Sequence, residues 1–149
     1  MSSNSYLSTV TISFLQSTGS VEISGNTALV SVALPNLEQV FGNFVFRGNV
    51  LLSQLVLTSL HSIGGIFVLQ STALSTFNAP SLAFILGSGH SSTVGFQIGS
   101  NPQLESLNVP DLVSYGDGAF QICLNGPSFE IPTSFQSLWS GQSLSLIHI

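Results

Sequence analysis

The stretch NTALVSVALPNLEQVFGNFVFRG, residues 26–48, is followed directly by NVLLSQLVLTSLHSIGGIFVLQS, residues 49–71. The two segments are equally long and superpose without a gap, so that Leu29 falls on Leu52 and Phe44 on Phe67. A fixed period of about 23 residues is the sequence signature of a repeat architecture, in which each period forms one structural unit. The period therefore decides the fold.

The repeat extends in both directions from this pair. Asn101 and Asn125 begin two later units, and a partial unit with Gly19, Val21 and Ile23 leads into Asn26. The interval from Asn49 to Asn101 holds one ordinary and one enlarged unit. In this interval Ser71 or Thr72 stands where Asn is expected, and residues 88–93 are an insertion.

Within each unit the apolar residues alternate, as in Val32-x-Leu34 and Phe44-x-Phe46, which is typical of strands with one buried face. Pro and Gly separate these short runs, and no segment holds a helical apolar stripe. The sequence predicts an all-β, right-handed parallel β-solenoid of about five turns, since parallel crossovers favour the right hand. The predicted internal stack is Phe44, Phe67, Phe96 and Phe120, and the predicted corner column is Asn26, Asn49, Asn101 and Asn125.

We expect a single solenoid domain over residues 1–149. Residues 1–18 form an N-terminal partial turn or cap, residues 19–125 the repeats, and residues 126–149 an irregular C-terminal cap. The last stretch, Ser143 to Ile149, does not continue the repeat, and the chain is interpreted as a fragment of a larger protein.

The composition excludes several functions. Only 5% of the residues are charged, the formal net charge is −5, and Arg47 is the single Lys or Arg. One cation cannot neutralise a phosphate backbone, so nucleic acid is not an expected partner. No apolar run reaches the roughly 18 residues needed to span a bilayer, and no leader is visible.

The titratable residues do not predict a catalytic centre. The six acidic residues fall on different turns and sides, whereas a carbohydrate-active β-helix needs carboxylates within about 5–10 Å of each other. The three His residues are scattered, so neither a metal nor another cofactor is expected. His61 aligns with Glu38 one turn earlier, which predicts at most a weak surface pair. We therefore expect that the chain is not an enzyme.

Two candidate partner-binding sites follow from the pattern. The insertion is the widest departure from the repeat, and loops on a rigid scaffold often carry function; its candidate residues are Ser88, Gly89, His90 and Ser91. An outward apolar patch is predicted from Val45, Val68 and Ile66, and such patches mark interaction surfaces. The orientation of Cys123 stays open, because strand alternation places it outward and a second pattern places it inward.

The unit L-x-x-h-x-h-P-x-L-x-x-h-x-G-x-h-x-h-x-x-N, in which h is apolar, resembles the receptor L-domain family of cell-surface leucine-rich β-helices over roughly residues 19–125. The segment from Pro110 to Cys123 also resembles surface leucine-rich repeats of bacteria and protists. The resemblance implies a non-catalytic extracellular or cell-surface recognition module, or a cell-wall-associated one, with a protein or glycan ligand. Two alternatives stay open: a structural or surface-adsorbing solenoid of the ice-binding kind, and a carbohydrate-active β-helix enzyme.

Overall fold

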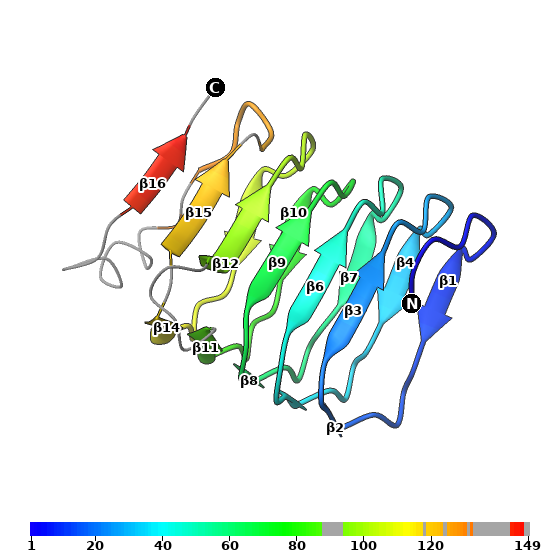
Figure 1. Ribbon diagram of the computed structural model, residues 1–149, viewed down its shortest axis with the longest axis horizontal. Helices are drawn as coiled ribbons and strands as arrows, with labels where there is room; N and C mark the ends of the chain where they lie inside the picture. Colours follow the sequence, from blue (N-terminus) through cyan, green and yellow to red (C-terminus); the bar gives the residue numbers. More distant parts are fainter. Residues whose placement is uncertain (88–93, 118, 124, 131, 133–143, 148–149) are drawn as a thin grey trace.

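The computed structural model describes residues 1–87, 94–117, 119–123, 125–130, 132 and 144–147 of the 149-residue chain. Over these residues the chain is all β, without a helix, and all the ladders between its strands are parallel. The strands form the walls of one solenoid (Figure 1). The predicted fold class is confirmed.

Each coil contributes one strand to each of three walls, which are named here in order. The first wall contains β3 (Val21–Ser24), β6 (Phe44–Arg47), β9 (Phe67–Gln70), β12 (Val94–Gly99), β15 (Ala119–Cys123) and β16 (Leu144–Ile147). The second wall contains β1 (Thr9–Thr11), β4 (Ser31–Ala33), β7 (Gln54–Val56), β10 (Thr76–Asn78) and β13 (Ser106–Asn108). The third wall contains β2 (Ser17–Thr18), β5 (Gln39–Val40), β8 (Ser62–Ile63), β11 (Phe84–Gly87) and β14 (Ser114–Asp117).

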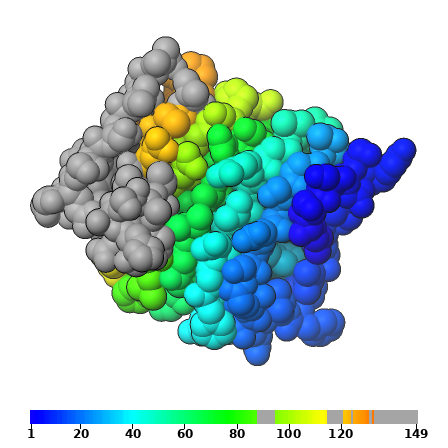
Figure 2. Space-filling model, viewed as in Figure 1, coloured from blue at the N-terminus to red at the C-terminus, as the bar shows by residue number. Residues whose placement is uncertain are grey.

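The winding is right-handed. In Figure 1 the chain rises along β6 at the front, crosses at the top, and descends along β7 at the rear while it advances away from the N-terminus. The space-filling view in Figure 2 shows the coils as adjoining bands in the order of the sequence. The five strands of the third wall correspond to about four turns of the solenoid, whereas the sequence predicted about five. The first wall contains a sixth strand.

The ladder registers place equivalent residues of successive coils side by side. Phe44 pairs with Phe67, and Phe67 pairs with Phe96. The rings of Phe44 and Phe67 are stacked at 5.7 Å and 4°, and those of Phe67 and Phe96 at 4.9 Å and 20°. The predicted phenylalanine stack is confirmed for these three rings, while at Phe120 the structure describes the backbone register with Phe96. The stack lies inside a core formed by all three walls.

The predicted asparagine column is confirmed at the corner after the first wall. The Oδ1 atom of Asn49 accepts hydrogen bonds from the backbone N–H and the Nδ2 of Asn26, at 3.0 and 3.3 Å. Asn101 and Asn125 repeat this arrangement, with 3.3 and 3.1 Å. Thr72 takes the place of Asn in the enlarged region and donates to Asn101 Oδ1 through both its N–H and its Oγ1. The column thus supplies partners for backbone groups that the corner removes from the ladders.

The residues before Asn26, Asn49, Thr72 and Asn101 have a left-handed backbone. Gly25 and Gly48 have φ of 67° and 66°, a conformation that glycine adopts without steric cost. Ser71 and Ser100 occupy the equivalent positions with φ of 55° and 56°. Left-handed geometry costs an L-residue about 1–2 kcal/mol, so the two serines are sites of local strain.

The described residues at both ends of the chain pair with the neighbouring coils. The segment 1–18, predicted as a partial turn or cap, contributes β1 and β2 to the second and third walls, where they pair with β4 and β5 of the next coil. Near the C-terminus, Leu144 pairs with Phe120, so β16 continues the first wall. This strand lies within the stretch that the repeat pattern left out. Other residues predicted to form the C-terminal cap, 133–143, lie outside the described residues.

Candidate functional site

Of the two candidate partner-binding sites predicted from the sequence, the structure describes one. Ser88, Gly89, His90 and Ser91 lie outside the described residues. Val45 and Ile66 are half-buried, but Val68 is only 2% exposed, so it does not offer the open apolar surface that was predicted. Val68 lies in the middle of the first wall, where its ladder neighbours Val45 and Gln97 flank it on both sides.

Further along the outer surface of the first wall, two polar side chains are paired. Gln97 Nε2 donates a hydrogen bond to Oε1 of Gln121 in the adjacent coil, at 2.8 Å. Cys123 is free and half-buried, and its Sγ lies beside Gly99, where an added Cβ would be 3.1 Å from it. Cys123 is thus on the same side of β15 as Gln121, the outward orientation of the two considered.

The outer face of the second wall carries two ranks of small or uncharged side chains. The ladder and strand order gives the first rank as Thr9, Ser31, Gln54, Thr76 and Ser106, and the second as Thr11, Ala33, Val56, Asn78 and Asn108. Side-chain hydrogen bonds connect β10 and β13. Thr76 Oγ1 lies 2.9 Å from Ser106 Oγ, and Asn108 Nδ2 donates to Asn78 Oδ1 at 2.6 Å. This face has no charged side chain in either rank.

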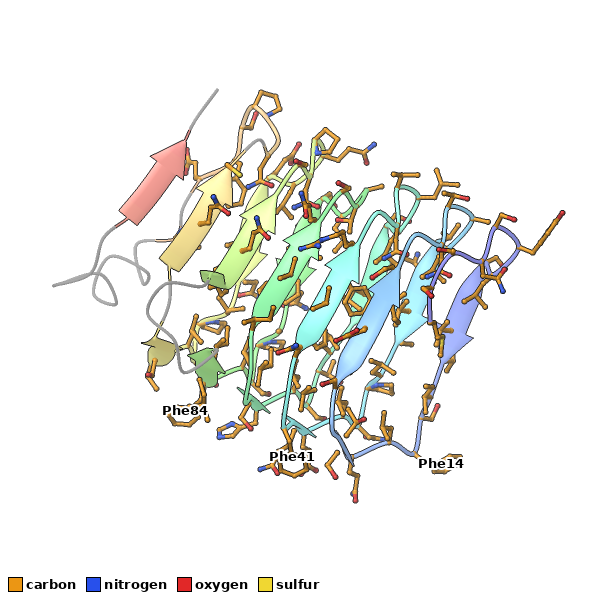
Figure 3. All side chains as sticks on the ribbon, in the orientation of Figure 1. Phe14, Phe41 and Phe84 are labelled. Carbon is orange, nitrogen blue, oxygen red and sulfur yellow. The ribbon has the colours of Figure 1, made fainter. Side chains whose placement is uncertain are left out.

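The third wall presents several large exposed apolar side chains. Figure 3 shows Phe14, Phe41 and Phe84 pointing outward along one edge of the solenoid. Leu86 is the next outward residue of β11 after Phe84, and Val113 directly precedes β14. We call these five residues the aromatic edge; their exposed fractions are Phe14 97%, Phe41 66%, Phe84 37%, Leu86 58% and Val113 63%.

Two contacts between adjacent coils lie along the aromatic edge. A Cβ added at Gly64 would collide with the backbone O of Phe41, so the coil next to Phe41 requires glycine there. The ring of His61 contacts the ring of Phe84 edge-on, with centroids 5.4 Å apart. His61 also donates its backbone N–H to the carbonyl of Glu38 at 2.8 Å, which confirms the alignment of these two residues in adjacent coils.

Sequence reasoning missed the aromatic edge, although a signal was present. Val40, Ile63 and Ile85 were aligned as inward residues, and alternation places the residues after them outward. Phe41 and Leu86 occupy that outward position, with Gly64 in the coil between them. An apolar residue at an outward register position is the pattern that identifies such a surface.

The described residues do not assemble a metal centre. They contain no group of three His, Cys, Asp or Glu side chains close enough to hold a metal ion. Glu22, Glu38, Glu105, Asp111 and Glu130 are all exposed and lie on separate segments.

A cavity of about 210 Å³ opens at the N-terminal end of the solenoid. Its lining is mostly apolar and includes Met1, Val10, Ile12 and Leu34, with Glu22 as its acidic residue. It is smaller than typical ligand pockets, which begin at about 300 Å³. Its volume therefore does not support a site for a ligand of ordinary size at this end of the solenoid.

Comparisons with known proteins give no match: no family model fits the chain, and no curated protein and no solved structure is significantly similar to it. Within the described residues, no helix is present that could cross a membrane.

Proposed function

We propose that the chain is a non-catalytic recognition module that acts outside the cell, at a cell surface or in a cell wall. The aromatic edge is the observation that carries this proposal. Exposed apolar side chains that gather along one edge, rather than being scattered singly, mark a surface used for contact. The resemblance of the repeat to receptor L-domains supports the same class of function and the same location.

The rest of the described surface is consistent with binding rather than chemistry. Exposed acidic side chains on separate segments do not form the paired carboxylates of a glycosidase. The parallel ladders and the buried asparagine column make each wall a rigid support. A rigid, largely uncharged wall loses little conformational entropy when it binds.

The proposal predicts that binding to isolated cell walls or intact cells depends on the aromatic edge. The double variant Phe41→Ser, Leu86→Ser should bind at least about tenfold more weakly than the wild type, because both side chains are exposed and lose their contact area. A sedimentation assay with labelled protein measures this. The matched control is Val30→Ser, Val56→Ser, which removes two exposed apolar side chains elsewhere. Equal loss in both variants, or no binding by the wild type, contradicts the proposal.

A second function is favoured by the outer face of the second wall. Within each uncharged rank, successive residues of paired strands are spaced by the strand separation of about 4.8 Å, on either side of the break between β7 and β10. Such rows suit adsorption to a crystalline surface such as ice. Wild-type protein should then slow ice recrystallisation, and Ala33→Tyr, which places a large ring among the ranks, should abolish the effect. Ser62→Tyr on the third wall is the control and should keep it. Ice growth unchanged by the wild type excludes this function.

A further inference from the structure

The second wall ends at β1, whose outer edge lies at the N-terminal end of the solenoid (Figure 1). Toward the next coil this strand is paired: the Ile12 N–H donates to the Ala33 carbonyl at 3.0 Å, and the Ser8 carbonyl also accepts from that coil. Backbone groups of alternate residues point to opposite edges of a strand, so the N–H and C=O groups of Thr9 and Thr11 face away from the solenoid. In the part of the chain that the structure describes, no strand pairs with this edge.

The outer edge of β1 is complementary to itself. When two copies of it pair antiparallel, Thr9 of each copy faces Thr11 of the other and exchanges two hydrogen bonds with it, and Val10 faces Val10 on a twofold axis. Such a contact uses the same surface on both subunits, as twofold dimers do. Charged side chains and prolines are the usual features that prevent edge pairing, and residues 1–20 contain neither.

Two exposed aromatic side chains match this twofold axis. Tyr6 is 92% exposed and Phe14 is 97% exposed. Tyr6 stands four residues before Val10, and Phe14 stands four residues after it. Because the axis reverses the strand direction, Tyr6 of one copy and Phe14 of the other come to the same end of the contact, and this happens at both ends. Ring pairs at these two places bury apolar area that a single chain leaves in water.

The same contact closes the cavity at the N-terminal end of the solenoid. Its lining includes Val10, Ile12, Leu15 and Leu34, and its volume is about 210 Å³. Val10 lies in β1 and points inward, so the cavities of two copies face each other across the axis. The open end of a solenoid requires a cover for its apolar interior, and a second copy supplies it here.

The first three residues of the chain leave β1 accessible. They pair with the C-terminal end of β3 instead: the Ser24 N–H donates to the Met1 carbonyl and the Ser3 N–H to the Ser24 carbonyl, both at 2.9 Å. A twofold axis through Val10 turns β3 of the second copy end for end. Residues 1–3 of the two copies therefore occupy opposite halves of the space between the two β3 strands.

We infer that the chain forms a twofold-symmetric dimer in which β1 pairs antiparallel with β1 of a second copy and Tyr6 packs against Phe14 at each end of the contact. The occupant is a second copy because only the same strand brings a matching ring to both ends at once. This inference is independent of the proposed recognition function, whose test residues Phe41 and Leu86 lie in later coils.

Sedimentation equilibrium of the full-length protein measures the dimer, which should form as the protein concentration rises. Thr11→Pro removes an outward N–H from each copy and should weaken dimerisation at least about tenfold. Thr11→Val keeps this N–H and should match the wild type. An edge strand tolerates proline where the N–H faces solvent, so Thr11→Pro should fold, which thermal denaturation checks. Phe14→Ser leaves the backbone unchanged and should also weaken dimerisation about tenfold.

A disulfide tests the register of the contact. In a Cys123→Ser background, Val10→Cys places one thiol of each copy at the axis. Residues facing each other there have Cα atoms about 4.5 Å apart, within the range that a disulfide spans, so mild oxidation with diamide should link two copies covalently. Val32→Cys in the same background is the matched control. Val32 is the equivalent residue of β4, which is paired on both edges, and it should not cross-link.

Three outcomes overturn the inference. The first is a wild-type chain that stays monomeric at every concentration; the recognition function then stands or fails by its own test. The second is a dimer that persists in Phe14→Ser and does not cross-link through Val10→Cys. The third is a dimer that Phe41→Ser, Leu86→Ser abolishes while Phe14→Ser retains it, because the aromatic edge is then the interface. If Thr11→Pro does not fold, Phe14→Ser and the disulfide decide.

Discussion

Replacing Phe67 by alanine is expected to lower the free energy of unfolding by about 4 kcal/mol, within the range measured for large core truncations. Phe67 is fully buried, and its ring contacts Phe44, Phe96 and Phe77. Alanine leaves a cavity that rigid neighbouring coils cannot close, and it removes ring pairs that contribute about 0.5–1.5 kcal/mol each beyond their buried area.

The measurement is thermal or urea denaturation of the purified chain. A loss of this size shifts the melting temperature of a chain of this length by roughly 8–16 °C. Phe41→Ala is the matched control: the same substitution at a 66% exposed ring should change stability by no more than about 0.5 kcal/mol. If the two variants are equally stable, Phe67 is not enclosed and the stacked core is wrong.

The second large effect is expected at Asn49, where alanine should cost about 3 kcal/mol, because it leaves a buried donor and a buried acceptor without partners. Asn49 is fully buried, its Nδ2 donates to the Ile23 carbonyl at 2.8 Å, and its Oδ1 accepts from the backbone N–H of Asn26 at 3.0 Å. Each unsatisfied buried group costs about 1–3 kcal/mol, so the two losses together account for the expected effect.

Asn36→Ala provides the comparison for Asn49. Asn36 is exposed and makes one hydrogen bond to the Ser13 carbonyl at 2.7 Å, so water can replace its partner. Its loss should cost less than about 1 kcal/mol. The urea midpoints of the two variants measure this difference in stability. The two variants expose nearly the same surface on unfolding, so the free energy of unfolding depends on urea concentration with nearly the same slope in both. A cost at Asn49 no larger than at Asn36 would show that the column does not stabilise the corners.

The fold was predictable because two independent patterns coincide. The repeat period sets which strands pair, and the alternation within each unit sets which side chains face inward. Both had to be right for Phe44, Phe67 and Phe96 to stack and for Thr72 to fall into the asparagine column, as they do.

The features that the sequence did not predict depend on contacts between coils rather than on the repeat itself. The alternation of Leu144 and Leu146 in the sequence is too short a pattern to identify β16 as a further strand. The burial of Val68 depends on its neighbours in adjacent strands, and an outward position in a single strand does not reveal it. The aromatic edge is similar, since Phe41 and Leu86 are far apart in the sequence and share one row only when the coils are stacked.

The asparagine column is interrupted between Asn49 and Thr72, and this interruption affects how the chain unfolds. Among the described residues, Asn49 and Thr72 share no side-chain hydrogen bond, and at the same coil boundary the second-wall ladder stops between β7 and β10. In a solenoid each coil is stabilised by its nearest neighbours alone, so the weakest boundary separates units that unfold independently. Amide protons on the N-terminal and C-terminal sides of this boundary should therefore exchange as two cooperative blocks with different protection, instead of fading gradually from the ends.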